Sequence, residues 1–229
     1  MSTTIYTSNG KVLINASNNK WYKKPLDPFN PLGLDPLTIR AKFASGYSPT
    51  ADASAGAPVT LTVVDADENI WDITSDYFGP NVTQPRSGWK SNMISVLGLN
   101  AGDGNIAVNQ LFYEYTGLVS CANIGFKVSS VLARLFYGCT SLKNVPMITC
   151  PGVATTDDAP QRIDRMFWGC RNVESGTYNM YQYLRSILPN TTSTTGPYGY
   201  APFYQCGDQT VTGAAELAQI PTTWGGTAE

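Results

Sequence analysis

Residues 132–147 read Leu-Ala-Arg-Leu-Phe-Tyr-Gly-Cys-Thr-Ser-Leu-Lys-Asn-Val-Pro-Met, and part of this stretch occurs again elsewhere in the chain. Residues 135–139 correspond to residues 166–170 and, more loosely, to residues 202–206. A weaker copy lies upstream at residues 111–115, where tyrosine takes the place of the cysteine. Because the whole chain has only 5 cysteines, three Phe-aromatic-x-Cys copies indicate an internal repeat.

The copies align on a phenylalanine, and successive aligned phenylalanines are 24, 31 and 36 residues apart. The first spacing lies in the range of leucine-rich repeats, and the longer ones require insertions at residues 151–158 and 176–198. Aligned phenylalanine, cysteine and aliphatic positions are predicted to form the repeat core. These residues are Phe112, Phe136, Phe167, Phe203, Cys139, Cys170, Cys206, Leu118, Leu142 and Val173.

The motif resembles the BspA-like leucine-rich-repeat family, whose repeats contain Met-Phe-x-Gly-Cys-x-x-Leu-x-x-Val-Pro. The copy at residues 135–146 matches that pattern at nearly every fixed position, and residues 217–226 resemble the end of such proteins. The resemblance covers residues 111–226, but the repeats vary in length and the last one lacks its leucine. It implies a mainly β fold with short helices, in which a small N-terminal β unit precedes an irregular leucine-rich-repeat solenoid.

Three regions are predicted: a hairpin and Pro-rich arm at residues 1–36, a β unit that caps the solenoid at 37–92, and the repeat domain at 93–229. Strands at residues 5–7 and 11–14 flank an Asn-Gly turn typical of hairpins. Four prolines at positions 25, 28, 31 and 36 exclude a helix or an interior strand, so residues 21–32 are predicted to form an extended arm. The arm presents Trp21, Tyr22 and Phe29 as anchoring side chains, on the surface either of the same chain or of a partner.

Further along the chain, residues 37–43 and 58–64 alternate apolar and polar side chains, which predicts strands with one buried face. Residues 70–73 are expected to pair back on the second strand as a hairpin. A helix is predicted at residues 178–188, and one or two helical turns at residues 131–137 and 161–167.

Cys139, Cys170 and Cys206 share one column of the repeat, which favours packed thiols over disulfides. Cys121 and Cys150 lie outside this column, so for these two both a disulfide and free thiols stay open.

The chain has no histidine, which removes the commonest general base and His metal ligands. Residues 65–69, with Asp76, imitate a calcium loop, but Ile70 stands where the loop needs glycine. A hairpin turn of solvated acids is the preferred interpretation. We therefore predict no enzymatic activity, no cofactor and no metal.

Only 14% of the residues are charged and the net charge is -2, so the chain has no electrostatic footprint for nucleic acid. No window approaches the roughly 20 apolar residues of a membrane helix, so no membrane insertion is expected. The first residues show no secretory signal, which favours a virion over an ordinary secreted protein.

Proteins of the resembled group occur on bacterial surfaces and among phage-encoded genes. We therefore expect a non-enzymatic bacteriophage virion component, such as a fibre, decoration or tail-associated subunit. Its expected partners are other virion proteins, further copies of itself as a trimer or another symmetric oligomer, and a host surface protein or glycan. The alternative is a bacterial cell-surface adhesin that binds a host protein or glycan.

Tyrosines near the predicted helix are candidates for an outward contact face, with half-buried packing as the other interpretation. They are Tyr178, Tyr181, Tyr183, Tyr198 and Tyr200.

Overall fold

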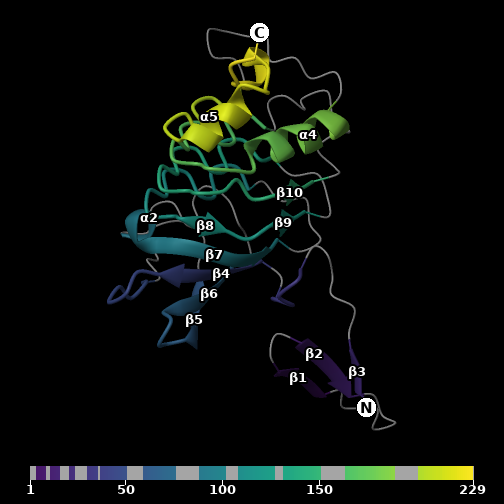
Figure 1. The fold of residues 1–229 in the computed structure, drawn as a ribbon. Helices are drawn as coiled ribbons and strands as arrows, with labels where there is room; N and C mark the ends of the chain where they lie inside the picture. The colour runs from purple at the N-terminus through teal and green to yellow at the C-terminus, as the bar shows by residue number, and fades with distance from the viewer. Residues whose placement is uncertain are drawn as a thin grey trace.

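The computed structural model shows a mainly β chain with few short helices, as the sequence predicts (Figure 1). It describes residues 4–8, 11–15, 21–23, 30–35, 37–50, 59–75, 88–101, 108–126, 131–150, 163–188 and 201–228. For the first three of these ranges only the backbone is described. Phe29, Asp76, Tyr198 and Tyr200 lie outside the described residues.

The N-terminal strands form a three-stranded antiparallel sheet in the order β1-β2-β3. Strands β1 (Thr4–Ser8) and β2 (Lys11–Asn15) confirm the predicted hairpin. Strand β3 (Trp21–Lys23) was not predicted, because the prolines that follow it dominated the interpretation of this segment. Since the side chains of Trp21 and Tyr22 are not described, their anchoring role stays a prediction.

A second sheet has the strand order β5-β6-β4-β7-β8. Strand β4 (Thr38–Phe43) pairs antiparallel with β6 (Ile70–Thr74) and with β7 (Met93–Asn100). On its other side β7 pairs in parallel with the short β8 (Ser120–Cys121). The boundary predicted between residues 92 and 93 therefore falls between segments whose strands share one sheet.

Burial across this sheet follows the predicted alternation in β4 and, in part, in β5 (Thr60–Asp65). Ile39, Ala41 and Phe43 of β4 have no solvent exposure. On the predicted buried face of residues 58–64, Val59 and Leu61 are half-buried against the core, but Val63 is 49% exposed. Among the described residues, β5 is the last strand in the order, so no further strand lies beside it. Its apolar side chains alternate as in a buried strand, but they are not fully buried at this edge.

Four segments that contain the repeated motif are stacked above β7, and we call them tiers (Figure 1). Tiers 1 to 4 comprise residues 108–126, 131–150, 163–188 and 201–220. Strand β9 (Ile124–Gly125) of tier 1 pairs in parallel with β10 (Ile148–Thr149) of tier 2. The helices are α2 (Trp89–Asn92) before β7, α4 (Thr177–Ile187) in tier 3 and α5 (Val211–Leu217) in tier 4, and the 3-10 helix η2 (Thr222–Trp224) follows. Helix α4 confirms the helix predicted at residues 178–188.

Each motif folds by sending alternate N–H groups in two directions. In tier 2, Leu135 and Tyr137 donate to the carbonyl group three residues earlier, which closes a tight turn. The N–H groups of Phe136 and Gly138 donate instead to carbonyl oxygens of tier 3, with N–O distances of 2.8 Å in both cases. Tier 1 repeats this scheme against tier 2. The motif therefore satisfies its backbone groups partly within itself and partly through the next tier.

The helical turns predicted at residues 131–137 and 161–167 are wrong in detail. Arg134 and Arg165 have φ values of 55° and 49°, and Gly138 has a φ of 70°, all in the left-handed region. A right-handed helix cannot include such residues. A single helical turn and the observed turn with left-handed residues space their apolar side chains in the same way, so the sequence pattern did not distinguish them.

The aligned phenylalanines form a continuous stack through the tiers. Their ring centroids are 5.2 Å apart from Phe112 to Phe136, 5.3 Å from Phe136 to Phe167 and 5.9 Å from Phe167 to Phe203. All ten residues predicted as the repeat core are 0% exposed. The core runs without interruption from Ile39 in β4 to Trp224 in η2.

Candidate functional site

The residue after each aligned phenylalanine is aromatic, and these four side chains form a second stack on the outer side of the turns. We call Tyr113, Tyr137, Trp168 and Tyr204 the aromatic column. Ring centroids are 4.9 Å apart from Tyr113 to Tyr137, 6.4 Å from Tyr137 to Trp168 and 4.2 Å from Trp168 to Tyr204. All four side chains are half-buried, whereas the adjacent phenylalanines are fully buried. Each tier thus contributes one ring to the core and one to the surface.

Two cations lie against the rings of the aromatic column. The Nζ of Lys90, in α2, lies 5.2 Å from the centroid of the Tyr113 ring. The guanidinium of Arg165 lies 5.3 Å from the centroid of the Trp168 ring. Desolvation raises the pKa of Tyr113 above that of an ordinary tyrosine, which is itself neutral at pH 7, so the hydroxyl is able to donate or accept a hydrogen bond.

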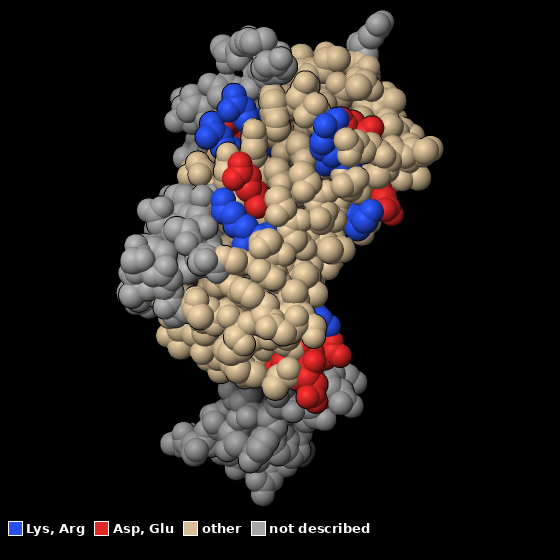
Figure 2. Space-filling model, turned by 90° about the vertical axis from the view of Figure 1, so that its left-hand side faces the viewer, with Lys and Arg blue, Asp and Glu red and all other residues tan. Residues whose placement is uncertain are grey.

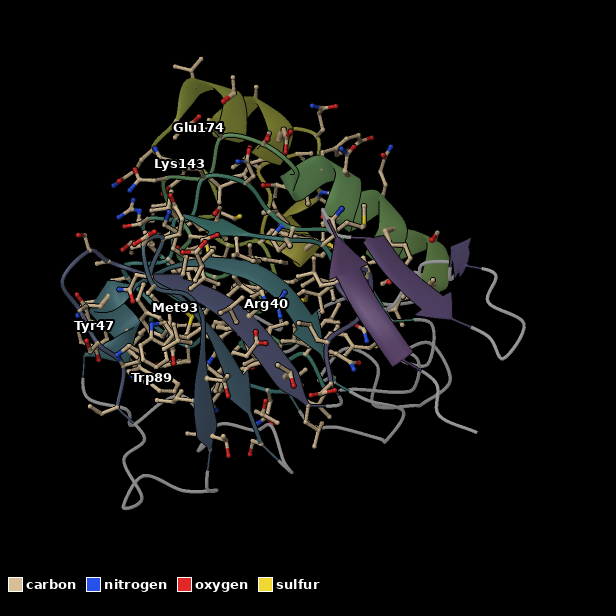
Figure 3. The ribbon with its side chains drawn as sticks, turned by 90° about the horizontal axis from the view of Figure 1, so that it is seen from below. Arg40, Tyr47, Trp89, Met93, Lys143 and Glu174 are labelled. Carbon is tan, nitrogen blue, oxygen red and sulfur yellow. The ribbon has the colours of Figure 1, made fainter. Side chains whose placement is uncertain are left out.

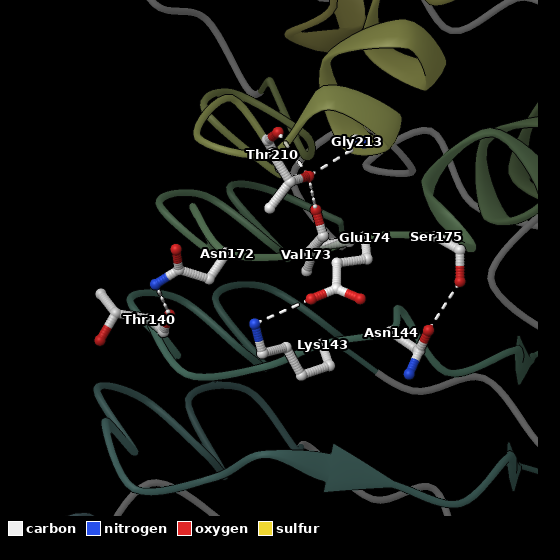
Figure 4. A network of polar contacts seen from close by, with 10 residues as sticks. Thr140, Lys143, Asn144, Asn172, Val173, Glu174, Ser175, Thr210 and Gly213 are labelled. Carbon is white, nitrogen blue, oxygen red and sulfur yellow. Dashed lines mark hydrogen bonds and ion pairs between the residues drawn. The ribbon is translucent and has the colours of Figure 1, made fainter.

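Ion pairs also join neighbouring tiers. Arg171 of tier 3 makes a bidentate contact with Asp208 of tier 4, at 3.0 and 2.7 Å. Lys143 of tier 2 lies 2.8 Å from Glu174 of tier 3 (Figure 4). Figure 2 shows acidic and basic side chains gathered in mixed groups, separated by an area without charged groups. Exposed ion pairs of this kind add little stability, so their main effect is to place charged groups on the surface of the tiers.

A row of hydrogen bonds from uncharged polar groups also crosses the tiers (Figure 4). The Oγ of Ser175 lies 2.6 Å from the Oδ1 of Asn144, and the Nδ2 of Asn172 donates to the carbonyl of Thr140 at 2.8 Å. Thr210 donates its hydroxyl to the carbonyl of Val173. These bonds fix the vertical register of the tiers and hence the spacing of the column.

The cysteine column is buried and donates hydrogen bonds to the backbone of the tier before it. The thiols of Cys139 and Cys170 lie 3.0 Å from the carbonyl oxygens of Phe112 and Phe136. Burial raises the pKa of the thiols of Cys170 and Cys206, so they are poor nucleophiles. The packed-thiol interpretation is confirmed.

Cys121 and Cys150 are free thiols as well, which decides between the two alternatives that the sequence left open for this pair.

The tyrosines of α4 are half-buried and pack against the hydrophobic core. Tyr181 packs edge-on against Trp224, with centroids 5.3 Å apart, and Tyr178 lies 6.0 Å from Tyr181. The hydroxyl of Tyr183 accepts a hydrogen bond from the N–H of Cys150 at 2.8 Å. These contacts favour the half-buried packing interpretation over an outward face.

The aromatic column was not predicted, although its signal is present in the repeat. A residue that is aromatic in every copy, directly after a buried phenylalanine, must point away from the core if neighbouring side chains alternate. The sequence could therefore have located this surface.

The acidic turn at residues 65–69 has the structure of a hairpin turn. The Oδ1 of Asp65 accepts from the N–H groups of Asp67 and Glu68, at 3.0 Å each. In the part of the chain that the structure describes, no three His, Cys, Asp or Glu side chains are placed to hold a metal ion.

A polar cleft of about 410 Å³ lies beside this turn and is lined by Lys42, Tyr47 and Asn69, among others. Figure 3 shows Tyr47 near Trp89 and Met93 at this end of the sheet. Asn69 donates to the carbonyl groups of Ala44 and Tyr47, so its amide serves to hold the loop at residues 44–48.

No protein-family model, no curated protein and no solved structure matches this chain. Among the described residues, no helix has the length and apolar character needed to cross a membrane.

Proposed function

We propose that this chain is a leucine-rich-repeat-type solenoid that serves as a non-enzymatic binding module. Stacked phenylalanines, the repeated hydrogen bonds between tiers and the parallel pairing of β9 with β10 support the solenoid. In such architectures each repeat contacts its neighbours, and the outer side of the stack forms an extended contact surface.

The aromatic column is the observation that carries the binding role. Tyrosine and tryptophan are enriched in interfaces because they give a large contact area at a small cost in side-chain entropy. The rings cover one another's faces within the column, so a partner meets their edges and hydroxyl groups. A host surface protein or a glycan, both rich in oxygen acceptors, has this chemistry.

The proposed setting is a bacteriophage virion, in which the chain is a fibre, decoration or tail-associated subunit. The resemblance of the motif to a group with phage-encoded members supports this setting. Further partners there are other virion proteins and copies of the chain itself. The second candidate is a bacterial cell-surface adhesin, which the same resemblance supports.

The binding role is tested with labelled recombinant protein on intact bacterial cells and on immobilised host glycoproteins. Tyr113→Ser changes the end of the column, and Tyr178→Ser is the matched control on α4. We expect Tyr113→Ser to weaken binding at least tenfold and Tyr178→Ser to leave it unchanged, with both variants shown to be folded by their thermal transitions. Equal binding by Tyr113→Ser and the native chain would contradict the role of the column.

The setting is tested with antibodies against the recombinant protein. Detection in purified phage particles supports the virion, and detection in bacterial envelopes without particles supports the adhesin.

A further inference from the structure

Among the described residues, strand β5 lies at the edge of the second sheet. In the described part of the chain its only strand neighbour is β6, and its residues are exposed except for the half-buried Leu61. Edge strands are usually protected by proline, by charged side chains, by a β-bulge or by being very short. The sequence Thr-Leu-Thr-Val-Val-Asp has six residues, no proline or lysine, and a charge only at its end. Its one register shift lies at that end, between Val63 and Asp65. Apart from that end, the composition of β5 is that of a strand with a hydrogen-bonded neighbour on each side.

Apolar rows that cross the sheet continue to this edge. Ile39, Ile73 and Leu61 form one row across β4, β6 and β5. In this row Ile39 and Ile73 are buried and Leu61 is half-buried.

The neighbouring row of Ala41, Trp71 and Val63 is buried at Ala41, half-buried at Trp71 and 49% exposed at Val63. One more strand beside β5 would continue both rows and cover Leu61 and Val63.

The sequence of β5 is complementary to itself in antiparallel pairing. A two-fold axis at Thr62 places Leu61 opposite the partner's Val63, and Thr62 opposite the partner's Thr62. Threonines that face each other on paired strands are able to hydrogen-bond. Thr38 and Thr74 do so within this sheet, with their hydroxyl oxygens 3.2 Å apart.

The charges beside β5 select the antiparallel orientation. An acidic turn that contains Asp67 and Glu68 follows the strand. Parallel pairing would place two such turns side by side, whereas antiparallel pairing places them at opposite ends of the ribbon. We infer that β5 pairs antiparallel with β5 of a second copy of this chain, about a two-fold axis at Thr62, so that the two sheets become one. A two-fold contact of this kind closes on itself and produces a dimer.

Disulfide trapping tests the register of the pairing. With the axis at Thr62, Thr62→Cys places two thiols opposite each other, whereas the two Cα atoms in Thr60→Cys lie about 13 Å apart along the strands. A disulfide requires Cα atoms within about 7 Å. We expect a covalent dimer from Thr62→Cys under mild oxidation, and none from Thr60→Cys or from the native chain with its free thiols. No dimer from Thr62→Cys, or equal dimer from both variants, would overturn the inference.

Analytical ultracentrifugation of the full chain tests the association itself. Val63→Lys places a charge in the paired edge and is expected to weaken dimerisation at least tenfold. Val211→Lys makes the same change at a valine that is 91% exposed on α5, and should leave dimerisation unchanged. A native chain that is monomeric at all concentrations, or equal effects of the two variants, would refute the contact. The readout is independent of binding to cells, so it separates this inference from the proposed function.

Discussion

Two residues after each aligned phenylalanine, the backbone is left-handed whatever residue stands there. Gly138 and Gly169 have φ values of 70° and 74°, and Glu114 and Gln205 have values of 58° and 55°. Glycine adopts this conformation without steric cost, whereas other residues lose about 1–2 kcal/mol. The repeat thus contains a position that favours glycine, and in two copies Glu114 and Gln205 adopt the left-handed conformation there with steric strain.

Gln205→Gly is therefore expected to raise the free energy of unfolding by about 0.5–1 kcal/mol, once the greater freedom of glycine in the unfolded chain is subtracted. Urea denaturation followed by circular dichroism measures the change. Gln205→Ala is the control, because it keeps a Cβ at the left-handed position and should give no gain. An equal gain from alanine would mean that the glutamine side chain, not the backbone, causes the strain.

The buried thiols predict how stability depends on pH. Burial raises the pKa of Cys170 and Cys206, so these thiols stay protonated in the folded chain after they ionise in the unfolded chain. The unfolded chain then binds fewer protons, and stability falls as the pH rises. The loss begins near the unfolded thiol pKa of about 8.5 and reaches about 1.4 kcal/mol per pH unit for each thiol.

Urea denaturation at pH values from 7 to 9 measures this slope, and keeps the pH about one unit below the ordinary tyrosine pKa of about 10. Cys170→Ala, although less stable at every pH, should show a shallower slope. A slope unchanged by the substitution would show that this thiol does not ionise on unfolding.

At the scale of the element, helix α4 depends on a carboxylate from α5. Its N-cap is Gly176, which has no side chain to accept from the first N–H groups. The two carboxylate oxygens of Glu216 accept from the N–H groups of Gly176 and Tyr178, at 3.2 and 3.0 Å. A carboxylate at a helix N-terminus also interacts favourably with the helix dipole. Glu216 thus caps a helix of the preceding tier.

Glu216→Ala should lower the free energy of unfolding by about 1–2 kcal/mol, because two N–H groups lose their acceptor. Glu216→Gln, which keeps one acceptor, should cost less. Glu174→Ala is the control: it removes an exposed ion pair with Lys143 and should cost less than about 1 kcal/mol. If both alanine variants cost the same, the capping contact has no special role.

The elements predicted correctly are those whose side-chain pattern is typical of only one type of secondary structure. The hairpin at residues 4–15, strand β4 and helix α4 belong to this group, as do the buried phenylalanines. The predictions were wrong where the burial or the backbone conformation of an element depends on its neighbours in the fold.

Strand β5 has the alternation of a covered strand but lies at an edge, and Arg134 is left-handed in a turn whose alternate N–H groups bond to the neighbouring tier. The aromatic column was missed for another reason. The predicted contact face consists of tyrosines near a helix, whereas the repeat itself sets which aromatic residues face outward.

For the whole molecule, the decisive feature is that the sheet and the tiers share one core. Long repeat arrays unfold in parts, since each repeat contacts only its neighbours. Here β7 pairs with β4 on one side and with β8 of tier 1 on the other, and the buried cluster extends from Ile39 to Trp224. We therefore expect one cooperative unit across the boundary predicted at residues 92 and 93.

Phe136→Ala tests this expectation, because it should destabilise tier 2 by about 3–5 kcal/mol through the cavity that it leaves in the phenylalanine stack. Native-state hydrogen exchange, read by mass spectrometry, reports the slowest amides of β4 and of tier 3 separately. In one cooperative unit both sets lose the same protection, although β4 is not in tier 2. Val211→Ala, on the exposed side of α5, should change neither set. A loss confined to the tiers, with β4 unaffected, would instead place an independent folding boundary between the sheet and the stack.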